Sequence, residues 1–260
     1  MSDRILIRYG ELSLKKSNRK QFTDKMKFTI KRALKDYPNL EYLDCSMRFY
    51  IILNDVNPDL IIPILKKIPG IYSFSIVSYC EKDLDKIKEL SCKLLKEELA
   101  HNEGTIKVNT SRSDKDFPME SLEISKAIAS YLFKNIPNLK ADVHDPKIVL
   151  NVDLRVEGCF IYTNIHYGLG GLPNGSIGKV ELLISGGIDS VVAGYLGIRK
   201  GMEIEAIHYA SPPYTSDMAV QKVIDLLEKL TPYTEYQSIT LIIVPFTKIQ
   251  QAICDNCRDD

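Results

Sequence analysis

The stretch VELLISGGIDSVVAGYLGIRK, residues 180–200, is typical of a strand, a glycine turn and a helix in direct succession. Residues 180–184 are an apolar run with β-branched residues at both ends, which predicts a strand buried on both faces. The tripeptide SGG at 185–187 breaks this run, and Asp189 or Ser190 can then cap a helix. The apolar positions of that helix are Val191, Val192, Tyr195, Leu196 and Ile198.

Such a loop is suited to holding an anion. At the C-terminal edge of a parallel sheet it aims free backbone N–H groups at one point, and the helix N-terminus favours negative charge. Two glycines let a ligand approach the backbone closely, so a phosphate or pyrophosphate is predicted there. There is no GxxxxGK[ST] motif, which argues against an NTPase that grips a γ-phosphate. A tight strand-to-helix turn without any ligand is the alternative.

The pattern SGGIDS at 185–190 resembles the SGGxDS loop of the PP-loop ATP pyrophosphatases. Members of that superfamily cleave ATP between the α and β phosphates and adenylate a substrate oxygen. The resemblance implies ATP as the nucleotide.

Charge is spread unevenly along the 260 residues. Lys plus Arg equals Asp plus Glu at 34 each, and 45% of residues are hydrophobic, so two or three domains with sizeable cores are expected. Residues 1–35 contain 11 basic and three acidic residues, whereas residues 201–260 contain four basic and nine acidic ones. This asymmetry predicts that a polyanion meets the N-terminal end.

Targeting and redox signals are weak. The opening MSDRILIRYGE lacks the apolar segment of a signal peptide, and no apolar run approaches membrane-spanning length, so we expect a cytoplasmic protein with no membrane partner. Six scattered cysteines fit a reduced protein better than a disulfide framework. Cys254 and Cys257 form a CxxC that could be redox-active or half a zinc site, but no second pair exists to complete a metal site.

The chain alternates between strands and helices in three parts. In the first, a small α+β unit, strands are predicted at 4–9 and 47–53 and helices at 18–37 and 59–68. The helix at 18–37 carries an apolar stripe and, on another face, a row of lysines that fits either a solvated face or a binding surface: Lys20, Lys27, Lys31 and Lys35.

The second part is predicted to be an α/β unit that closes on a hairpin, which indicates a mixed sheet. Its strands are expected at 73–79, 105–112, 147–156 and 160–167, and its helices at 83–100 and 120–135. The loop SRSDKDFP at 111–118 offers Arg112 and Lys115 beside Asp114 and Asp116. It is either a phosphate contact or an ordinary solvated loop.

The third part follows GLGGLPNGSIGK, residues 168–179, whose five glycines predict a linker. Strands at 180–184, 203–210 and 238–244 then alternate with helices, which predicts a parallel β-α-β-α-β-α unit. Three strands would leave an apolar edge uncovered, so this domain is expected to be incomplete.

Motifs along the whole chain resemble the tRNA uridine 4-sulfurtransferases, the thiouridine synthases of the ThiI family that also serve thiamine biosynthesis. RYGELSLKKSNRKQF at 8–22 resembles the family's opening, and IPGIYSFS at 68–75 resembles its junction before a THUMP domain. The series GLGGLP, SGGIDS and SPPYTS, between residues 168 and 216, is the most specific part of the resemblance.

The resemblance implies a multidomain α/β and α+β fold. A ferredoxin-like domain is expected at 1–59, a THUMP RNA-binding domain at 60–167, the glycine-rich linker at 168–179 and an incomplete, Rossmann-like PP-loop domain at 180–260. Further strands and the sulfur-transfer cysteine are expected beyond residue 260, where some members also carry a rhodanese-like domain.

In such enzymes the N-terminal domains hold tRNA while ATP activates O4 of uridine 8, and a persulfide then displaces AMP to leave 4-thiouridine. The resemblance therefore implies ATP and Mg²⁺ as cofactors, tRNA as a partner, a cysteine desulfurase as persulfide donor and a homodimer. Two alternatives stay open: a catalytically incomplete tRNA-binding fragment, and another PP-loop enzyme that ligates small molecules.

The family's functional residues can be carried over by position. Asp189 and Ser185 are the implied catalytic residues. The implied nucleotide-binding residues are Leu183, Ile184, Ser185, Gly186, Gly187, Asp189, Ser190, His208 and Tyr209. The implied RNA-binding residues are Arg8, Lys15, Asn18, Arg19, Arg112 and Lys115.

Overall fold

The structure, a computed structural model, describes residues 3–10, 18–45, 48–99 and 104–257. It divides into two compact units. The first unit comprises Met1–Ile7, Asn39–Pro58 and Phe74–His166, and the second comprises Arg8–Pro38, Asp59–Ser73 and Tyr167–Asp260.

The first unit is built on one long sheet with the strand order β2-β3-β1-β4-β8-β7-β5-β6, and β9 pairs with β4. The bounds of its strands are β1 Arg4–Arg8, β2 Glu41–Cys45, β3 Arg48–Ile52, β4 Ser73–Cys80, β5 Thr105–Arg112, β6 Lys140–Ala141, β7 Ile148–Arg155, β8 Gly158–Tyr162 and β9 His166–Tyr167.

The first four strands follow the ferredoxin-like order. Helix α1 (Arg19–Ala33) follows β1 and helix α2 (Pro58–Leu65) follows β3 in the chain, and β3 lies antiparallel between β1 and β2. This is the β-α-β-β-α-β pattern of that fold. The predicted strand at 4–9 and the helices at 18–37 and 59–68 are confirmed within a few residues at their ends.

The second of the three predicted parts has a mixed sheet, as expected. Strand β5 pairs in parallel with β7, while β7 pairs antiparallel with β8. Helices α3 (Leu84–Leu99) and α4 (Ser121–Asn135) contribute to one core with these strands; Ile87, Leu95, Ile128 and Leu150 are fully buried in it. The single strand predicted at 160–167 is wrong, because the chain leaves β8 after Tyr162 and pairs again only at β9.

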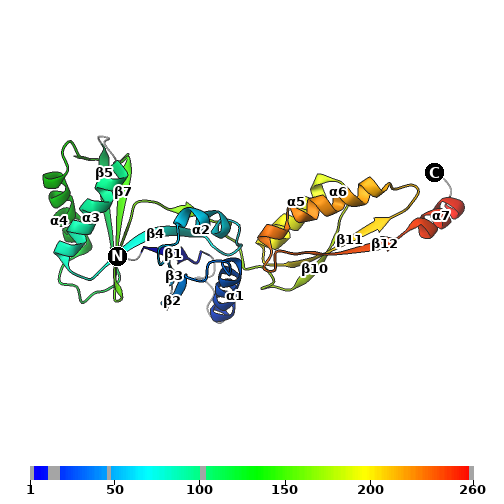
Figure 1. The fold of residues 1–260 in the computed structure, drawn as a ribbon, viewed down its shortest axis with the longest axis horizontal. Coiled ribbons are helices and arrows are strands. Elements are labelled where there is room, and N and C mark those ends of the chain that lie inside the picture. Colours follow the sequence, from blue (N-terminus) through cyan, green and yellow to red (C-terminus); the bar gives the residue numbers. More distant parts are fainter. Residues whose placement is uncertain (1–2, 11–17, 46–47, 100–103, 258–260) are drawn as a thin grey trace. The chain divides into compact units, whose positions relative to one another are not determined.

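The third part is a parallel sheet of three strands in the order β10-β11-β12, which confirms the predicted parallel alternation. Strand β10 is Lys179–Leu183, β11 is Glu203–Ala210 and β12 is Thr240–Pro245. Figure 1 shows helices α5 (Ile188–Arg199) and α6 (Asp217–Glu228) along the same side of this sheet. Their core includes Ile198, Val223 and Leu227. Helix α7 (Thr247–Asn256) follows β12.

The prediction that residues 180–184 are buried on both faces is wrong. Leu182 and Ile184 pack into the core beneath the helices, but Leu183 is 63% exposed. Within the described residues β10 is an edge strand, and α5 and α6 cover only one face of its sheet. An apolar run therefore does not guarantee that both faces are covered.

Part of the predicted apolar stripe of α5 is also wrong. Val191, Tyr195 and Ile198 pack into the core, but Val192 and Leu196 are 47% and 50% exposed. The helix has one buried face, and Val192 and Leu196 lie outside it.

Candidate functional site

The SGGIDS loop leaves the C-terminal end of β10 and leads directly into α5. Gly187 is the N-cap of α5, in extended backbone, and has no side chain that could accept from the first-turn N–H groups. The prediction that Asp189 or Ser190 caps the helix is therefore wrong, because the helix begins at Ile188 and both residues lie in its first turn. The Ser190 hydroxyl instead donates to the Gly187 carbonyl oxygen at 3.1 Å.

This geometry leaves the first-turn N–H groups of α5 without a side-chain acceptor from the N-cap. The Gly187 nitrogen lies 3.4 Å from Ser185 Oγ. A Cβ at Gly187 would lie 3.5 Å from the same oxygen, and no other described atom outside its chain neighbours and its own helix backbone would lie within 4 Å. The glycines thus leave room at the helix N-terminus, where the helix dipole favours an anion.

His208 and Tyr209 lie on opposite faces of β11. His208 is 8% exposed and shares its face with the buried Ile204 and Ala206, whereas Tyr209 is 46% exposed and packs edge-on against Phe246. Leu183, the last residue of β10, and Ile184, directly after it, differ in the same way, because Leu183 is exposed and Ile184 is buried. The predicted nucleotide-binding residues of the two strands therefore fall into two groups, one on each face of the sheet.

A hydrogen bond to the backbone of Ile184 fixes the orientation of the His208 ring. Its Nδ1 lies 2.9 Å from the Ile184 carbonyl oxygen, which can only accept a hydrogen bond, so Nδ1 carries the proton. Nε2 is buried and has no hydrogen-bond partner among the described residues. In the neutral ring Nε2 is an acceptor, and it lacks the donor that a buried polar atom usually has.

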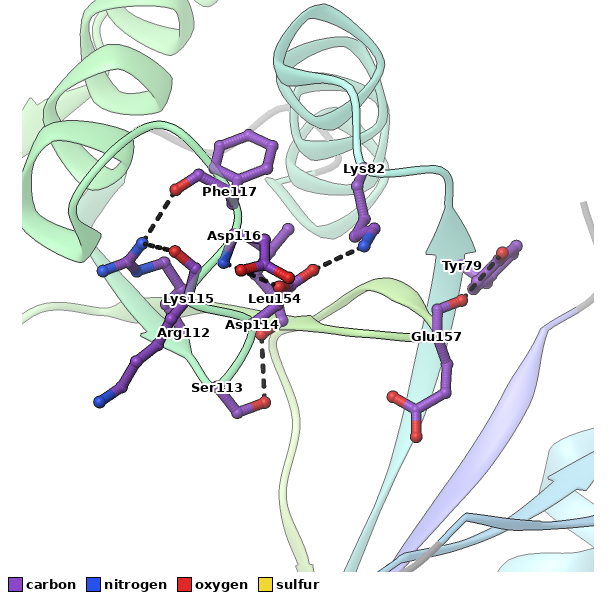
Figure 2. A network of polar contacts seen from close by, with 10 residues as sticks. All are labelled: Tyr79, Lys82, Arg112, Ser113, Asp114, Lys115, Asp116, Phe117, Leu154 and Glu157. Carbon is purple, nitrogen blue, oxygen red and sulfur yellow. Dashed lines mark hydrogen bonds and ion pairs between the residues drawn. The ribbon is translucent and has the colours of Figure 1, made fainter.

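A second candidate site is the loop at 111–118 between β5 and α4, shown in Figure 2. The Arg112 guanidinium turns back onto its own loop. Nη1 donates to the carbonyl oxygens of Phe117 at 2.9 Å and Lys115 at 3.3 Å, and Nη2 pairs with Glu120 at 2.9 Å. Arg112 thus shapes the loop, whereas Lys115 is exposed and forms no ion pair among the described residues.

Asp114 anchors the same loop from beneath. It is 4% exposed, accepts from Lys82 Nζ at 2.6 Å and accepts from the Asp116 N–H at 3.1 Å. The hydrogen bond from Lys82, followed by that from the Asp116 backbone, holds the pKa of Asp114 below its ordinary value of 3.8. Figure 2 shows the Lys82 ammonium reaching this carboxylate from the segment that precedes α3.

We expect Asp114→Asn to lower the melting temperature at pH 7, because both donors favour a carboxylate. Since the pKa is depressed in the folded state, this stabilisation is present above the unfolded-state pKa and is lost as the pH falls through the folded-state value. Melting curves from pH 7 to pH 2.5 should show the gap between wild type and variant close below about pH 4. Asp116→Asn, at an exposed position, is the control. A gap independent of pH would contradict the proposed role of the charge.

Comparison with known families gives three consecutive matches. Residues 4–75 match the ThiI ferredoxin-like domain, residues 81–164 the THUMP domain, and residues 175–260 the family described as thiamine biosynthesis protein (ThiI).

The chain belongs to the ThiI family. It is 46% identical over 251 residues to a probable tRNA sulfurtransferase of Geobacillus sp. strain WCH70 and 43% identical over 251 residues to one of Bacillus subtilis. Each match covers 96% of this chain and 62% of the relative. The chain thus spans somewhat less than two thirds of the length of these relatives.

Two solved structures share the fold of this ThiI-family chain. One is a 4-thiouridine synthetase in a complex with RNA and with bound ATP: the TM-score is 0.87 at 35% identity, over 100% of this chain and 66% of that one. The other is PH1313 of Pyrococcus horikoshii, with a TM-score of 0.82 at 25% identity, over 98% of this chain and 82% of that one. The ferredoxin-like, THUMP and Rossmann-like parts are therefore those of the family.

The basic N-terminal residues of the family's opening motif are only partly described. Lys15 lies outside the described residues. Asn18 and Arg19 are exposed at the start of α1, and Arg8 is half-buried at the end of β1. Lys20 and Lys35 of the predicted lysine row are exposed and form no ion pair within the described part of the chain.

Two other cations of α1 have a structural role that the sequence did not reveal. Lys25 forms an ion pair with Glu235, whose side chain is only 2% exposed, and Arg32 lies over the Tyr236 ring at 4.5 Å. The Glu235 N–H in turn donates to Asn174 Oδ1 at 3.2 Å. This part of α1 is thus attached to the segment that follows α6.

Lys222 of α6 also lies close to the SGGIDS loop, and the sequence did not reveal this proximity. A Cβ at Gly186 would lie 3.3 Å from Lys222 Cδ and 3.5 Å from its Nζ. The ammonium group forms no ion pair among the described residues, so it is available to an anion at the loop. No motif marks this lysine, because the fold alone brings α6 to Gly186.

Proposed function

We propose that this chain is the RNA-binding and nucleotide-activating part of a tRNA sulfurtransferase. In the proposed reaction, O4 of uridine 8 attacks the α-phosphorus of ATP and pyrophosphate leaves. The outer sulfur of a persulfide then attacks C4, and AMP departs with the former O4, which leaves a C4–S–S–protein disulfide. A second thiol attacks the inner sulfur and breaks the S–S bond, so that 4-thiouridine is released and the two protein thiols form a disulfide. A uracil carbonyl oxygen is a poor leaving group and an adenylate is a good one, which is the chemical reason for the first step.

The observation that carries this proposal is the uncapped N-terminus of α5 behind SGGIDS, with Lys222 beside it. We assign the phosphates of ATP to Ser185, Gly186, Gly187 and Ser190, because hydroxyls and free N–H groups gather there. Adenosine would lie against the strand ends that carry Leu183, Ile184, His208 and Tyr209.

Asp189 and Ser185 are proposed as the catalytic residues. Asp189 is exposed in the first turn of α5, and Ser185 lies at the end of β10, so both can reach a nucleotide at the loop. Their substitution should affect turnover more than folding, because neither side chain is buried.

Magnesium does not fit a site built by the protein alone. The described residues contain no group of three or more His, Cys, Asp or Glu side chains that could hold a metal ion. Mg²⁺ would therefore arrive with the phosphates of ATP, and Asp189 in the first turn of α5 could contact it there.

For RNA we propose contacts from Arg8, Lys15, Asn18 and Arg19 near the N-terminus and from Lys115 of the THUMP loop. Arg112 would act indirectly, by shaping the loop that presents Lys115. Folded RNA is recognised largely through its shape and phosphates, which suits exposed cations on separate elements. The solved relative that is named as a complex with RNA and ATP supports this assignment.

The remaining partners follow from the same proposal. A cysteine desulfurase would supply the persulfide, the sulfur could also serve thiazole formation for thiamine, and the chain would act in the cytoplasm as a homodimer. The described part of the chain contains no helix long and apolar enough to cross a membrane. For the domains we propose limits near the predicted 1–59 (ferredoxin-like), 60–167 (THUMP), 168–179 (linker) and 180–260 (PP-loop). The first limit is the exception: α2 and β4 complete the ferredoxin-like pattern, so we propose that this domain extends past residue 59.

A second candidate function is tRNA binding without catalysis. It is favoured by the small third sheet, in which Leu183, Tyr209 and Ile242 are exposed on the face away from α5 and α6. A small-molecule ligase of the PP-loop type is the third candidate. It does not explain the basic N-terminal end, because such an enzyme binds no nucleic acid.

One experiment separates these functions. Filter binding of an unmodified tRNA transcript should be tight at low salt and should weaken steeply between about 50 and 200 mM salt, by 10³-fold or more if six or more phosphates are contacted. Release of pyrophosphate from ATP is then measured with and without the transcript. Release that depends on tRNA supports the sulfurtransferase, whereas binding without release supports the binding module. No tRNA binding would contradict both and would favour the small-molecule ligase.

A further inference from the structure

The glycine-rich segment at 168–171 forms the floor of a pocket. The pocket has a volume of about 470 Å³, within the range of ligand sites, and is lined by this segment, Gly10, Gly70, Tyr72, Tyr167 and Arg199. All of these residues belong to the second compact unit, and the site at the start of α5 uses none of them.

Hydrogen bonds hold this floor in place. Gly170 N–H donates to the Ile71 carbonyl oxygen at 2.9 Å, and the Gly170 carbonyl oxygen accepts from Gly70 N–H at 2.8 Å. Gly168 N–H donates to the Tyr72 carbonyl oxygen at 3.0 Å. Residues 168–171, part of the segment that composition predicts to be a linker, therefore have a defined backbone conformation and line the pocket.

Two tyrosines form the walls. Tyr72 and Tyr167 are 53% and 65% exposed, and their rings meet at 90° with centroids 6.2 Å apart. Neither ring fills a core, so each presents apolar surface to the pocket and to solvent. Exposed aromatic rings of this kind serve as stacking surfaces for nucleic acid bases.

Arg199 provides the charge. Its Nη2 donates to the Leu169 carbonyl oxygen at 2.8 Å, while its Nε is buried without a hydrogen-bond partner. Among the described residues, no carboxylate pairs with Arg199 and no Asp or Glu lines the pocket. Arg199 is therefore the charged group of the described lining, and a phosphate in the pocket can pair with its guanidinium.

Gly170 leaves the floor open. It has a φ of +64°, and nothing lies within 4 Å of the place where its Cβ would be. A ligand can therefore contact the backbone of the floor, as a flat base would need to do.

We infer that this pocket binds one unpaired nucleotide of the RNA substrate, with its base against Tyr72 or Tyr167 and its phosphate near Arg199. The inference rests on the proposed RNA function and adds a recognition site that is separate from the RNA-contacting residues proposed above. Stacking tolerates any base, so the pocket selects an unstacked nucleotide rather than a sequence.

The test uses the whole chain with two RNAs: a fluorescein-labelled tRNA transcript and a blunt-ended duplex of similar length. Tyr72→Ala with Tyr167→Ala should weaken binding of the transcript about tenfold or more and leave duplex binding unchanged. The matched pair Tyr72→Phe with Tyr167→Phe keeps both rings and should bind both RNAs like wild type. Circular dichroism melts verify that the variants are folded.

A direct readout is ultraviolet cross-linking of a transcript that contains 5-bromouridine. We expect adducts on peptides that contain Tyr72 or Tyr167, and millimolar uridine monophosphate should not displace them, because the other contacts of the RNA hold it in place. Displacement would instead indicate a site for free nucleotides and overturn the inference.

Equal binding of the transcript by wild type and the alanine variant would also overturn it, as would an equal loss for both RNAs. If the wild-type chain binds neither RNA, the proposed function itself fails. The two failures are therefore distinguishable.

Discussion

Gly171→Ala should destabilise the protein by more than about 2 kcal/mol, whereas Gly170→Ala should cost about 1 kcal/mol. The two glycines are adjacent and both have positive φ, +72° and +64°, so the strain in the backbone is similar. The two positions differ in the room that is available for a Cβ atom. A Cβ at Gly171 would lie 2.0 Å from the Arg199 carbonyl oxygen, which already accepts from the Leu172 N–H at 3.0 Å.

Urea unfolding of the two variants measures this difference. Gly170→Ala is the control for the cost of a left-handed backbone, and the excess at Gly171 reports the clash. Because the clash is with a backbone atom, no rotation of a side chain can relieve it. Equal free energies of unfolding for the two variants would show that the segment shifts freely, although hydrogen bonds hold Gly168 and Gly170.

His208→Asn should weaken ATP binding about tenfold while leaving the stability near that of wild type. The asparagine amide can take the place of Nδ1 and donate to the Ile184 carbonyl oxygen, but it has nothing at the position of Nε2. Nε2 is the buried atom without a partner, so a nucleotide donor is the group expected to satisfy it.

His208→Gln is the matched control, because its longer side chain reaches the position of Nε2 and loses the bond to Ile184. We expect it to bind ATP more tightly than His208→Asn and to lose about 1 kcal/mol of stability. Calorimetric titration with ATP and urea unfolding give the two quantities. ATP affinity unchanged in His208→Asn would rule out a contact between Nε2 and the nucleotide.

Much of the fold could be predicted from hydrophobic periodicity. The strands predicted at 105–112 and 203–210 coincide with β5 and β11. Strand β2 was missed, because EYLDC is mostly polar and its side chains are half-buried or exposed. It is a strand because β3 supplies hydrogen-bonding partners, and pairing of this kind is invisible to a local pattern.

The candidate site was predictable in its composition and less so in its geometry. The SGGIDS motif located the loop, but the sequence could not show that His208, and not Tyr209, lies on the face of β11 that α5 and α6 cover. Arg112 resembled a free cation because its partners are mostly carbonyl oxygens of its own loop. Lys222 and Arg199 were missed because tertiary folding, and no motif, brings them to Gly186 and to the 168–171 segment.

Strand β4 has a consequence for how this architecture can be divided. It lies between β1 of the ferredoxin-like part and β8 of the THUMP part, and it falls where one family match ends at residue 75 and the next begins at 81. Cutting the chain there would strip a strand of partners and expose an aggregation-prone edge. The two parts therefore share one β-sheet. If they were transferred between proteins, both would have to be transferred together.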